Sequence, residues 1–380
     1  MDHDILRQEL KKFVVKHLEP VALEADEKGV FPMEVYQAFC ETGFGAVFLP
    51  EEFGGAASLK GLFIVMEELS RVSPAFALAT MSSFQLFGYN ICKIGTDAQK
   101  EKYLKGIVSD KKIGAWALTE PDTGSNAVGI ETSAKKDGDD YIIKGSKTFI
   151  TNAPIADYFI VITRTGGEGF DCASAFIVER EMKGVAVSEP FKKHGHRSSP
   201  TGQVFFDDVR VSKDQMLGQE GRGFYDMKHS LDIERVLVGP MVLGMLKGLL
   251  HKCVNYAAGR IQFGKPILTY QLIQEKIAKM RTHIELIEAC NEQALVQYEQ
   301  GKSLKNLATA LKLHAGRASV EMGSEAMQIL GGNGYMHEYG VEMFARDAKL
   351  LEIGGGTTEM MLQIMAKEAV RDVLGFVPKV

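Results

Sequence analysis

The sequence predicts an α+β protein of three consecutive domains: a helical domain, an antiparallel β domain and a second helical domain. Three observations lead to this fold class. The chain has 380 residues, too many for one simple hydrophobic core. Apolar residues recur with a helical period near both ends of the chain, and short β-rich runs fill the centre. We expect the domains to comprise residues 1–112, 113–223 and 224–380.

The three regions differ in how their apolar residues are spaced. In the first, "DILRQELKKFVVKHLEPVALEAD" predicts a helix that ends near Pro20, and "GLFIVMEELSRVS" has a strong helical pattern. In the second, "DDYIIKGSKTFIT", "DYFIVITRT", "SAFIVER" and "TGQVFFDDVRV" are separated by Gly and Asp turns, which is typical of antiparallel strands. After about Gly223 the helical pattern returns and continues to the C-terminus.

The composition is that of an ordinary soluble globular protein. Hydrophobic residues make up 45% and charged residues 24%, and a net charge of −5 offers no basic surface for nucleic acid. The five cysteines have no paired spacing, which favours a reducing compartment over a disulfide framework. We see no run of about 18 uncharged apolar residues to span a membrane, and the acidic N-terminus does not resemble a targeting peptide. We therefore expect a cytoplasmic protein.

Two glycine-containing segments are candidates for ligand binding. A helical pattern, rather than a strand, precedes "LGGNGY", so it does not match the usual dinucleotide-binding turn, and any nucleotide cofactor is held by another architecture. The segment "WALTEPDTGSN" runs from a strand into a turn with Pro121, Gly124 and Ser125, where N–H groups and a hydroxyl can face a ligand. Taken alone, this turn could equally be an ordinary hairpin loop.

Five motifs occur in the order and spacing of one known family. They are "LTEPDTGSN" with "FITN", "RSSPTGQVFFDDVRV", "GRIQFGKPILTYQLIQ", "QILGGNGY" and "RDAKLLEIGGGTTEM". Together they extend over essentially the whole chain, which resembles the acyl-CoA dehydrogenase family of flavoenzymes. The resemblance implies a C-terminal four-helix bundle, FAD as cofactor, an acyl-CoA substrate, an electron-transferring flavoprotein as acceptor, and a homotetramer.

The resemblance also indicates which residues bind FAD. Positions at the flavin ring and at the loop shared with CoA match Leu118, Thr119, Gly124, Ser125, Phe149 and Thr151. Positions that a neighbouring subunit contributes match Arg260, Phe263, Gln271, Gln328, Gly331 and Gly332, and a last group matches Thr357 and Glu359. Taken singly, Arg260 could be a surface charge and Gly331–Gly332 a helix C-cap. The combined pattern is what indicates a flavin site.

The expected chemistry needs a carboxylate beside the substrate Cα. In this family a base removes the α-proton of the thioester while the β-hydride passes to the flavin. Many members carry that glutamate directly before the Gly-Thr of the last motif, but "LEIGGGTT" has Gly355 there. Glu352 lies three residues earlier, outside this position, so we prefer a structural or solvent-facing role for it.

Glu234, in "SLDIERVLVGP", is the other candidate base. On a helix it shares a face with four apolar residues, Leu231, Leu237, Val238 and Met241. An ionisable group on such a face is usually paired or functional. Isovaleryl-CoA and long-chain dehydrogenases resemble this sequence in lacking the late glutamate and in carrying a base at the matching position. We therefore predict that Glu234 is the base, and that Asp232 and Arg235 pair with each other or contact CoA.

The substrate is expected beside the same glycines and Leu231. Gly354 stands where straight-chain members often have Tyr, and Gly355 has no carboxylate. These two absent side chains would leave space for a branched or cyclic acyl group. A backbone N–H at Gly355 would still be available to hold the thioester oxygen.

Other functions remain open at the level of sequence. The family relatives include enoyl-thioester reductases, oxygen-using oxidases and desulfinases, an acyl carrier protein could replace CoA, and a non-catalytic flavin-binding assembly protein could keep the fold. A candidate base argues against the assembly protein and the desulfinases. His194 and His196 lack a third ligand at metal spacing, so we expect a solvated loop there and no metal.

Overall fold

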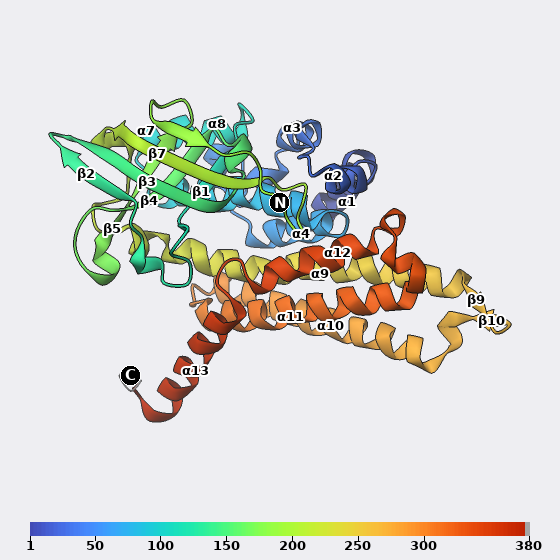
Figure 1. The fold of residues 1–380 in the computed structure, drawn as a ribbon. Helices are drawn as coiled ribbons and strands as arrows, with labels where there is room; N and C mark the ends of the chain where they lie inside the picture. The colour runs from blue at the N-terminus through green and yellow to red at the C-terminus, as the bar shows by residue number, and fades with distance from the viewer. Residues whose placement is uncertain (377–380) are drawn as a thin grey trace.

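The computed structural model describes residues 1–376, and its first part is helical (Figure 1). The helices are α1 (His3–Phe13), α2 (Ala22–Lys28), α3 (Met33–Glu41), α4 (Leu59–Ser70), α5 (Pro74–Met81), α6 (Asn90–Ile94), α7 (Asp97–Gln99) and α8 (Lys105–Val108). Asp2 caps α1 by accepting from the backbone N–H groups of Asp4 and Ile5, and the helical run stops before Pro20 as predicted. The α4 helix is buried on nearly every side because it packs against both α1 and α9.

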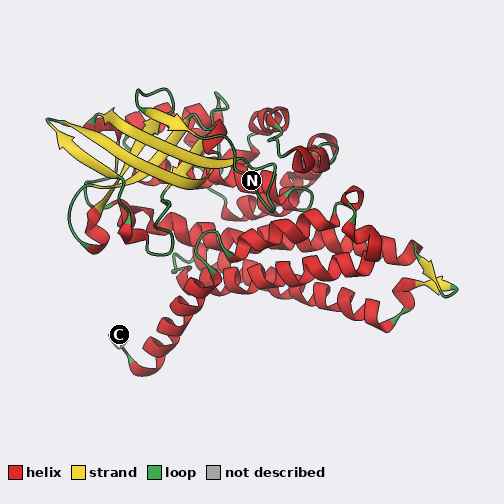
Figure 2. Cartoon of the chain, viewed as in Figure 1, coloured by secondary structure: helices red, strands yellow, loops and turns green. Residues whose placement is uncertain are grey.

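The second part is one sheet, drawn as yellow arrows in Figure 2. Its strands are β1 (Gly114–Ala117), β2 (Ser133–Asp137), β3 (Asp140–Thr151), β4 (Tyr158–Arg164), β5 (Ala173–Glu179), β6 (Val185–Val187), β7 (Thr201–Val211) and β8 (Met216–Leu217). Their order is β6-β7-β3-β2-β4-β5-β8, with β1 beside β4. Most pairs are antiparallel, as predicted. The β1–β4 pair is parallel, because the whole β2–β3 hairpin separates these strands along the chain.

The third part is the helical bundle that the sequence led us to expect. Its elements are α9 (Gly223–Gly259), the β9 (Ile261–Gln262) and β10 (Lys265–Pro266) hairpin, α10 (Gln271–Glu299), α11 (Lys305–Leu330), α12 (Val341–Ala348) and α13 (Thr358–Leu374). The first three helices pack on one another, and α12 lies against α11 and α9 (Figure 1). The α13 helix packs on α11 and then runs away from the bundle. Within residues 1–376, none of the helices has both the length and the apolar character of a membrane span.

The three parts meet at α12, and here one expectation from the sequence is wrong. His196 is fully buried, whereas we expected it in a solvated loop. Its backbone N–H donates to the Asp347 carboxylate, and its Nε2 lies 3.0 Å from the Asp347 carbonyl oxygen. Arg346 pairs with Asp26 of α2 and donates to the His194 carbonyl. The contact depends on residues some 150 positions apart, which no local pattern reveals.

This junction holds two buried groups with opposite proton preferences. Burial raises the pKa of Asp347 to about 7, although the His196 N–H opposes the rise. Burial also lowers the pKa of His196 to about 3, with the nearby Lys193 acting in the same direction. Between about pH 4 and 6.5 the folded pair is therefore neutral, while the unfolded pair is an anion and a cation.

In the wild type, the pH-dependent contributions of Asp347 and His196 to the unfolding free energy should cancel. A variant that lacks one of the two groups should show the contribution of the other. From pH 3.8 to 7 the unfolded Asp347 holds fewer protons than the folded one, so its contribution to stability falls as pH rises. From pH 3 to 6.5 the unfolded His196 holds more, so its contribution rises. Relative to wild type, the unfolding free energy of Asp347→Asn should climb by up to about 1.4 kcal/mol per pH unit, and that of His196→Gln should fall similarly. Urea unfolding at several pH values measures both slopes; parallel curves for all three proteins would contradict these pKa directions.

Candidate active site

Glu234 projects from the first third of α9 and has a carboxylate oxygen without a partner. Its Oε2 is buried, and none of the groups that the structure describes donates a hydrogen bond to it. Of the four apolar residues predicted to share its face, Leu237 and Met241 are buried, and Leu231 and Val238 are half-buried. Burial raises the pKa of Glu234 above its ordinary value, against the opposing charges of Arg235 and Lys312. A half-buried glutamate with one buried, unpartnered carboxylate oxygen and a raised pKa is suited to take up a proton.

The glycine loop between α12 and α13 passes directly over this carboxylate. Gly355 has φ +63° and Gly356 has φ +99°, a left-handed conformation that other residues rarely adopt. A Cβ on Gly355 would lie 3.2 Å from Glu234 Oε1 and 3.6 Å from Lys312 Cε. Positions 355 and 234 therefore face the same point in space, one without a side chain and the other with a carboxylate.

Two cations flank the loop. Arg235 donates from Nε to the Gly355 carbonyl oxygen at 3.4 Å and pairs with Asp232 at 3.9 Å, which agrees with the pairing expected from the sequence. Lys312 of α11, which the sequence did not indicate, is 2% exposed. Its Nζ donates to the carbonyl oxygens of Leu351 at 3.2 Å and Gly356 at 2.6 Å. Burial lowers the pKa of Lys312 to about 8, although Glu234 opposes this change.

The rejected candidate, Glu352, has a partner of its own. Its carboxylate pairs with Lys349 at 2.6 Å, and its carbonyl oxygen accepts from the Thr358 hydroxyl at 3.3 Å. These contacts agree with a structural role at the start of α13.

A buried ion pair holds the turn that follows β1. Lys147 of β3 is fully buried; its Nζ lies 2.7 Å from Glu120 and donates to the Leu118 carbonyl at 2.9 Å. Thr148 N–H donates to the Thr119 carbonyl at 2.8 Å. Burial lowers the pKa of Lys147 to about 8, and Glu120 opposes the change, so Lys147 remains a cation at neutral pH. No local pattern indicated this pair, which fixes Leu118 and Thr119 at the surface of the sheet.

The residues of this turn and the end of β3 fit a flavin. Phe149 is 67% exposed in a left-handed conformation with φ +57°, and its ring lies 5.8 Å from that of Phe191. Thr151, at the end of β3, is half-buried. Gly124 and Ser125 are exposed, with nothing within 4 Å of a Cβ on Gly124. A large aromatic held in a strained, open position beside a hydroxyl-bearing turn provides a wall for a planar ring and room for its tail.

The remaining predicted FAD residues fall into two places. Thr357 caps α13 by accepting from Met360 N–H at 3.3 Å, and Glu359 follows it, so both stand beside the glycine loop. The others gather at the opposite end of the bundle, near the β9–β10 hairpin (Figure 1): Arg260, Phe263, Gln271, Gln328, Gly331 and Gly332. Arg260 stands just past the end of α9, 26 residues after Glu234, which corresponds to about 39 Å of helix. One chain therefore does not bring this second group to Glu234.

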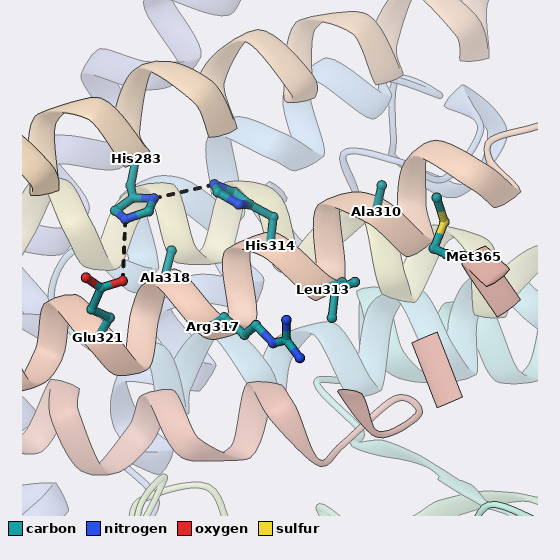
Figure 3. A pocket seen from close by; sticks show the side chains of 8 residues that line it. All are labelled: His283, Ala310, Leu313, His314, Arg317, Ala318, Glu321 and Met365. Carbon is teal, nitrogen blue, oxygen red and sulfur yellow. Dashed lines mark hydrogen bonds and ion pairs between the residues drawn. The ribbon is translucent and has the colours of Figure 1, made fainter. Parts of the chain in front are cut away.

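Two other features lie apart from this site. A hollow of about 440 Å³ lies between α10, α11 and α13. In it the His283 ring lies between His314 at 3.4 Å and Glu321 at 3.8 Å (Figure 3). Among the described residues, one group has metal-ligand spacing: Asp26, His337 and Glu342. Arg346 already pairs with both of its carboxylates.

Comparison with known proteins shows the family of this chain. Family models for the acyl-CoA dehydrogenase N-terminal, middle and C-terminal domains match residues 1–111, 115–209 and 221–370. The chain is 34% identical to the 3-(aryl)acrylate reductase of Clostridium sporogenes, over 97% of this chain and 98% of the relative. It is 32% identical to the cyclohexane-1-carbonyl-CoA dehydrogenase of Geobacter metallireducens, over 97% of both chains.

Solved structures give the same result. The butyryl-CoA dehydrogenase of Megasphaera elsdenii superposes with a TM-score of 0.94 at 33% identity, covering 98% of this chain and 100% of that one. A chain from the electron transferring flavoprotein structure of Acidaminococcus fermentans gives the same values. The FAD complex of PigA superposes with a TM-score of 0.92 at 26% identity, covering 97% and 99%.

The fold and the site together define a flavoenzyme that acts on acyl thioesters. The chain belongs to the acyl-CoA dehydrogenase family. It is an FAD-dependent oxidoreductase for the dehydrogenation or reduction of acyl-CoA thioesters.

Proposed function

We propose that this enzyme dehydrogenates a branched or cyclic acyl-CoA at Cα–Cβ, with Glu234 as the base. One observation carries the proposal. A Cβ at Gly355, where many relatives bear the catalytic glutamate, would lie 3.2 Å from Glu234 Oε1. A carboxylate from α9 thus reaches the place that the missing side chain would occupy.

The residues of this chain divide the work as follows. The Glu234 carboxylate accepts the α-proton and becomes a neutral acid, a change that its burial favours. Among the described residues no oxygen accepts from the Gly355 N–H, so this donor is free for the thioester oxygen, where charge develops as the proton leaves. Bound FAD supplies the acceptor for the β-hydrogen and its electron pair, so that the product is an α,β-enoyl thioester. Likeness to the Acidaminococcus chain supports an electron-transferring flavoprotein as the next acceptor.

Replacing Glu234 with Gln should stop flavin reduction while leaving ligand binding intact. The amide keeps the shape of the side chain but cannot accept the proton, and loss of a general base costs about 10²–10⁴ in rate. Anaerobic rapid mixing with substrate measures the reduction rate, and equilibrium titration measures binding.

Glu352→Gln is the matched control and should reduce flavin at nearly the native rate. The assignment is wrong if Glu352→Gln loses the reaction and Glu234→Gln keeps it. Moving the base with Glu234→Gly and Gly355→Glu should restore only part of the rate, because a side chain at φ +63° costs about 1–2 kcal/mol.

We further propose that a second copy of the chain completes each FAD site. The support is the distance between Glu234 and Arg260 along one helix, together with Phe263, which is 95% exposed at the tip of the hairpin. A side chain of that size and exposure gains apolar burial only from a ligand or another molecule.

Mixed oligomers test this proposal directly. Glu234→Gln and Arg260→Ala should each be inactive alone, the second through weak FAD retention. If each site combines Glu234 of one copy with Arg260 of another, an oligomer containing both variants has one native site. Co-expression with two different tags and tandem purification should therefore regain activity and bound flavin. Mixed oligomers as inactive as the parents would show that both residues act within one chain.

The acyl group is proposed to be bulky near the thioester. Gly354 has ordinary backbone geometry, and a Cβ there would meet nothing closer than Leu350 at 3.6 Å, so the wall is open where straight-chain relatives often carry Tyr. Similarity to a cyclohexane-1-carbonyl-CoA dehydrogenase supports a cyclic substrate.

Gly354→Tyr should therefore penalise branched and cyclic substrates selectively. A phenol ring would fill the space in which each extra methylene gains roughly 0.8 kcal/mol on burial. Specificity constants for isovaleryl-, cyclohexanecarboxyl-, butyryl- and octanoyl-CoA measure the effect. A wild-type preference for octanoyl-CoA by tenfold or more would refute the assignment.

Reduction of an enoyl thioester is the second candidate function. Similarity to a 3-(aryl)acrylate reductase favours it, since one site can run in both directions. Turnover of a matched acyl and enoyl pair, with oxidised and reduced dyes, compares the two directions.

A further inference from the structure

Lys312 is a buried cation whose near contacts are neutral oxygens. Its Nζ donates to the carbonyl groups of Leu351 and Gly356, which bracket the glycine loop from either side. Among the described residues, no carboxylate oxygen lies within 4.0 Å of this ammonium group, the distance at which an ion pair forms. The carbonyl groups are neutral, so they do not cancel the positive charge of the ammonium group. In a buried site this charge therefore acts strongly on charged groups that lie further away.

The charge that acts most strongly on Lys312 is the Glu234 carboxylate. Both side chains flank the point where a Cβ on Gly355 would stand, Glu234 at 3.2 Å and Lys312 at 3.6 Å. The other charges near the site are Arg235 and Asp232 on α9 and Glu352 beside the loop. Arg235 has the larger effect on Glu234, but Asp232 pairs with it.

We propose that Lys312 is a positioning residue for proton abstraction: anchored on the Leu351 and Gly356 carbonyls, it fixes the loop over Glu234 and holds that carboxylate in the anionic form that can accept a proton. This role rests on the proposed function of Glu234 as base.

The pH dependence follows from the signs of the charges. Burial raises the pKa of Glu234 and the Lys312 charge lowers it, so removing that charge raises it further. Below the new pKa, the fraction of ionised base falls about tenfold per pH unit. Because the pKa of Lys312 is about 8, the wild type loses the same charge above that pH. The wild type and a charge-free variant should thus differ at low pH and converge above about pH 8.

The test compares Lys312→Met and Lys312→Arg with wild type, all loaded with FAD. Infrared titration follows the protonated carboxyl band that Glu234→Gln removes, which reports on Glu234 without turnover. Its midpoint should move up by about one unit or more in Lys312→Met and stay near the native value in Lys312→Arg. The low-pH limb of flavin reduction should move by the same amount in Lys312→Met and stay in place in Lys312→Arg.

Lys305→Met is the matched control. Lys305 lies on the same helix, α11, but it forms an ion pair with Glu368 of α13. Replacing Lys305 should therefore move neither midpoint. If Lys312→Met does not fold, Lys312→Gln carries the same test. A uniform loss of rate at all pH values with an unmoved carboxyl midpoint would overturn the proposal, since that is what a merely structural lysine would give. If Glu234→Gln still reduces flavin, the proposed role of Glu234 as base is wrong. The infrared midpoint of the Lys312 variants would still report the effect of Lys312 on Glu234, so the two proposals can fail separately.

Discussion

The whole site depends on keeping one carboxylate oxygen, Glu234 Oε2, buried and without a hydrogen-bond donor. Among the described groups none donates a hydrogen bond to Glu234 Oε2, and a buried carboxylate oxygen in that state costs several kcal/mol unless nearby charge compensates it. The glycine loop can close over it only because Gly355 and Gly356 adopt left-handed conformations, which also cost backbone entropy. Neither feature is stable alone. Arg235 from α9 and Lys312 from α11 hold the loop carbonyls and place positive charge beside the acid.

The rest of the fold also holds the glycine loop in place over Glu234. The loop leaves α12, and α12 is fixed by the His196–Asp347 contact to the sheet and by the Arg346–Asp26 pair to α2, so all three parts of the chain set its position. In the β domain, the buried Lys147–Glu120 pair holds the turn at Leu118. Strain and burial are concentrated at the site, and ordinary packing in the rest of the fold sustains them.

The sequence predicted most of the elements because their patterns are local. Helical spacing marked α4 and α9 and placed Glu234 on an apolar face, and the loss of an acid at 355 pointed to it a second time. Lys312 was missed although the same reasoning applies: Ala308, Leu311, Ala315 and Ser319 are buried around it on α11. The burial of His196, the Lys147–Glu120 pair and the parallel β1–β4 contact depend on segments that meet only in the folded chain, so no local pattern could reveal them.

The central claim is that Glu234, and not another acid, takes the proton from the substrate Cα. Phenylacetyl-CoA isolates this step, because its Cα bears protons and its β-carbon has no hydrogen to give to the flavin. Incubation in D₂O, followed by mass spectrometry of the recovered thioester, measures exchange at Cα without redox chemistry. The account predicts exchange that requires FAD-loaded wild type or Glu352→Gln and is lost in Glu234→Gln. Exchange that persists in Glu234→Gln at the wild-type rate would contradict it.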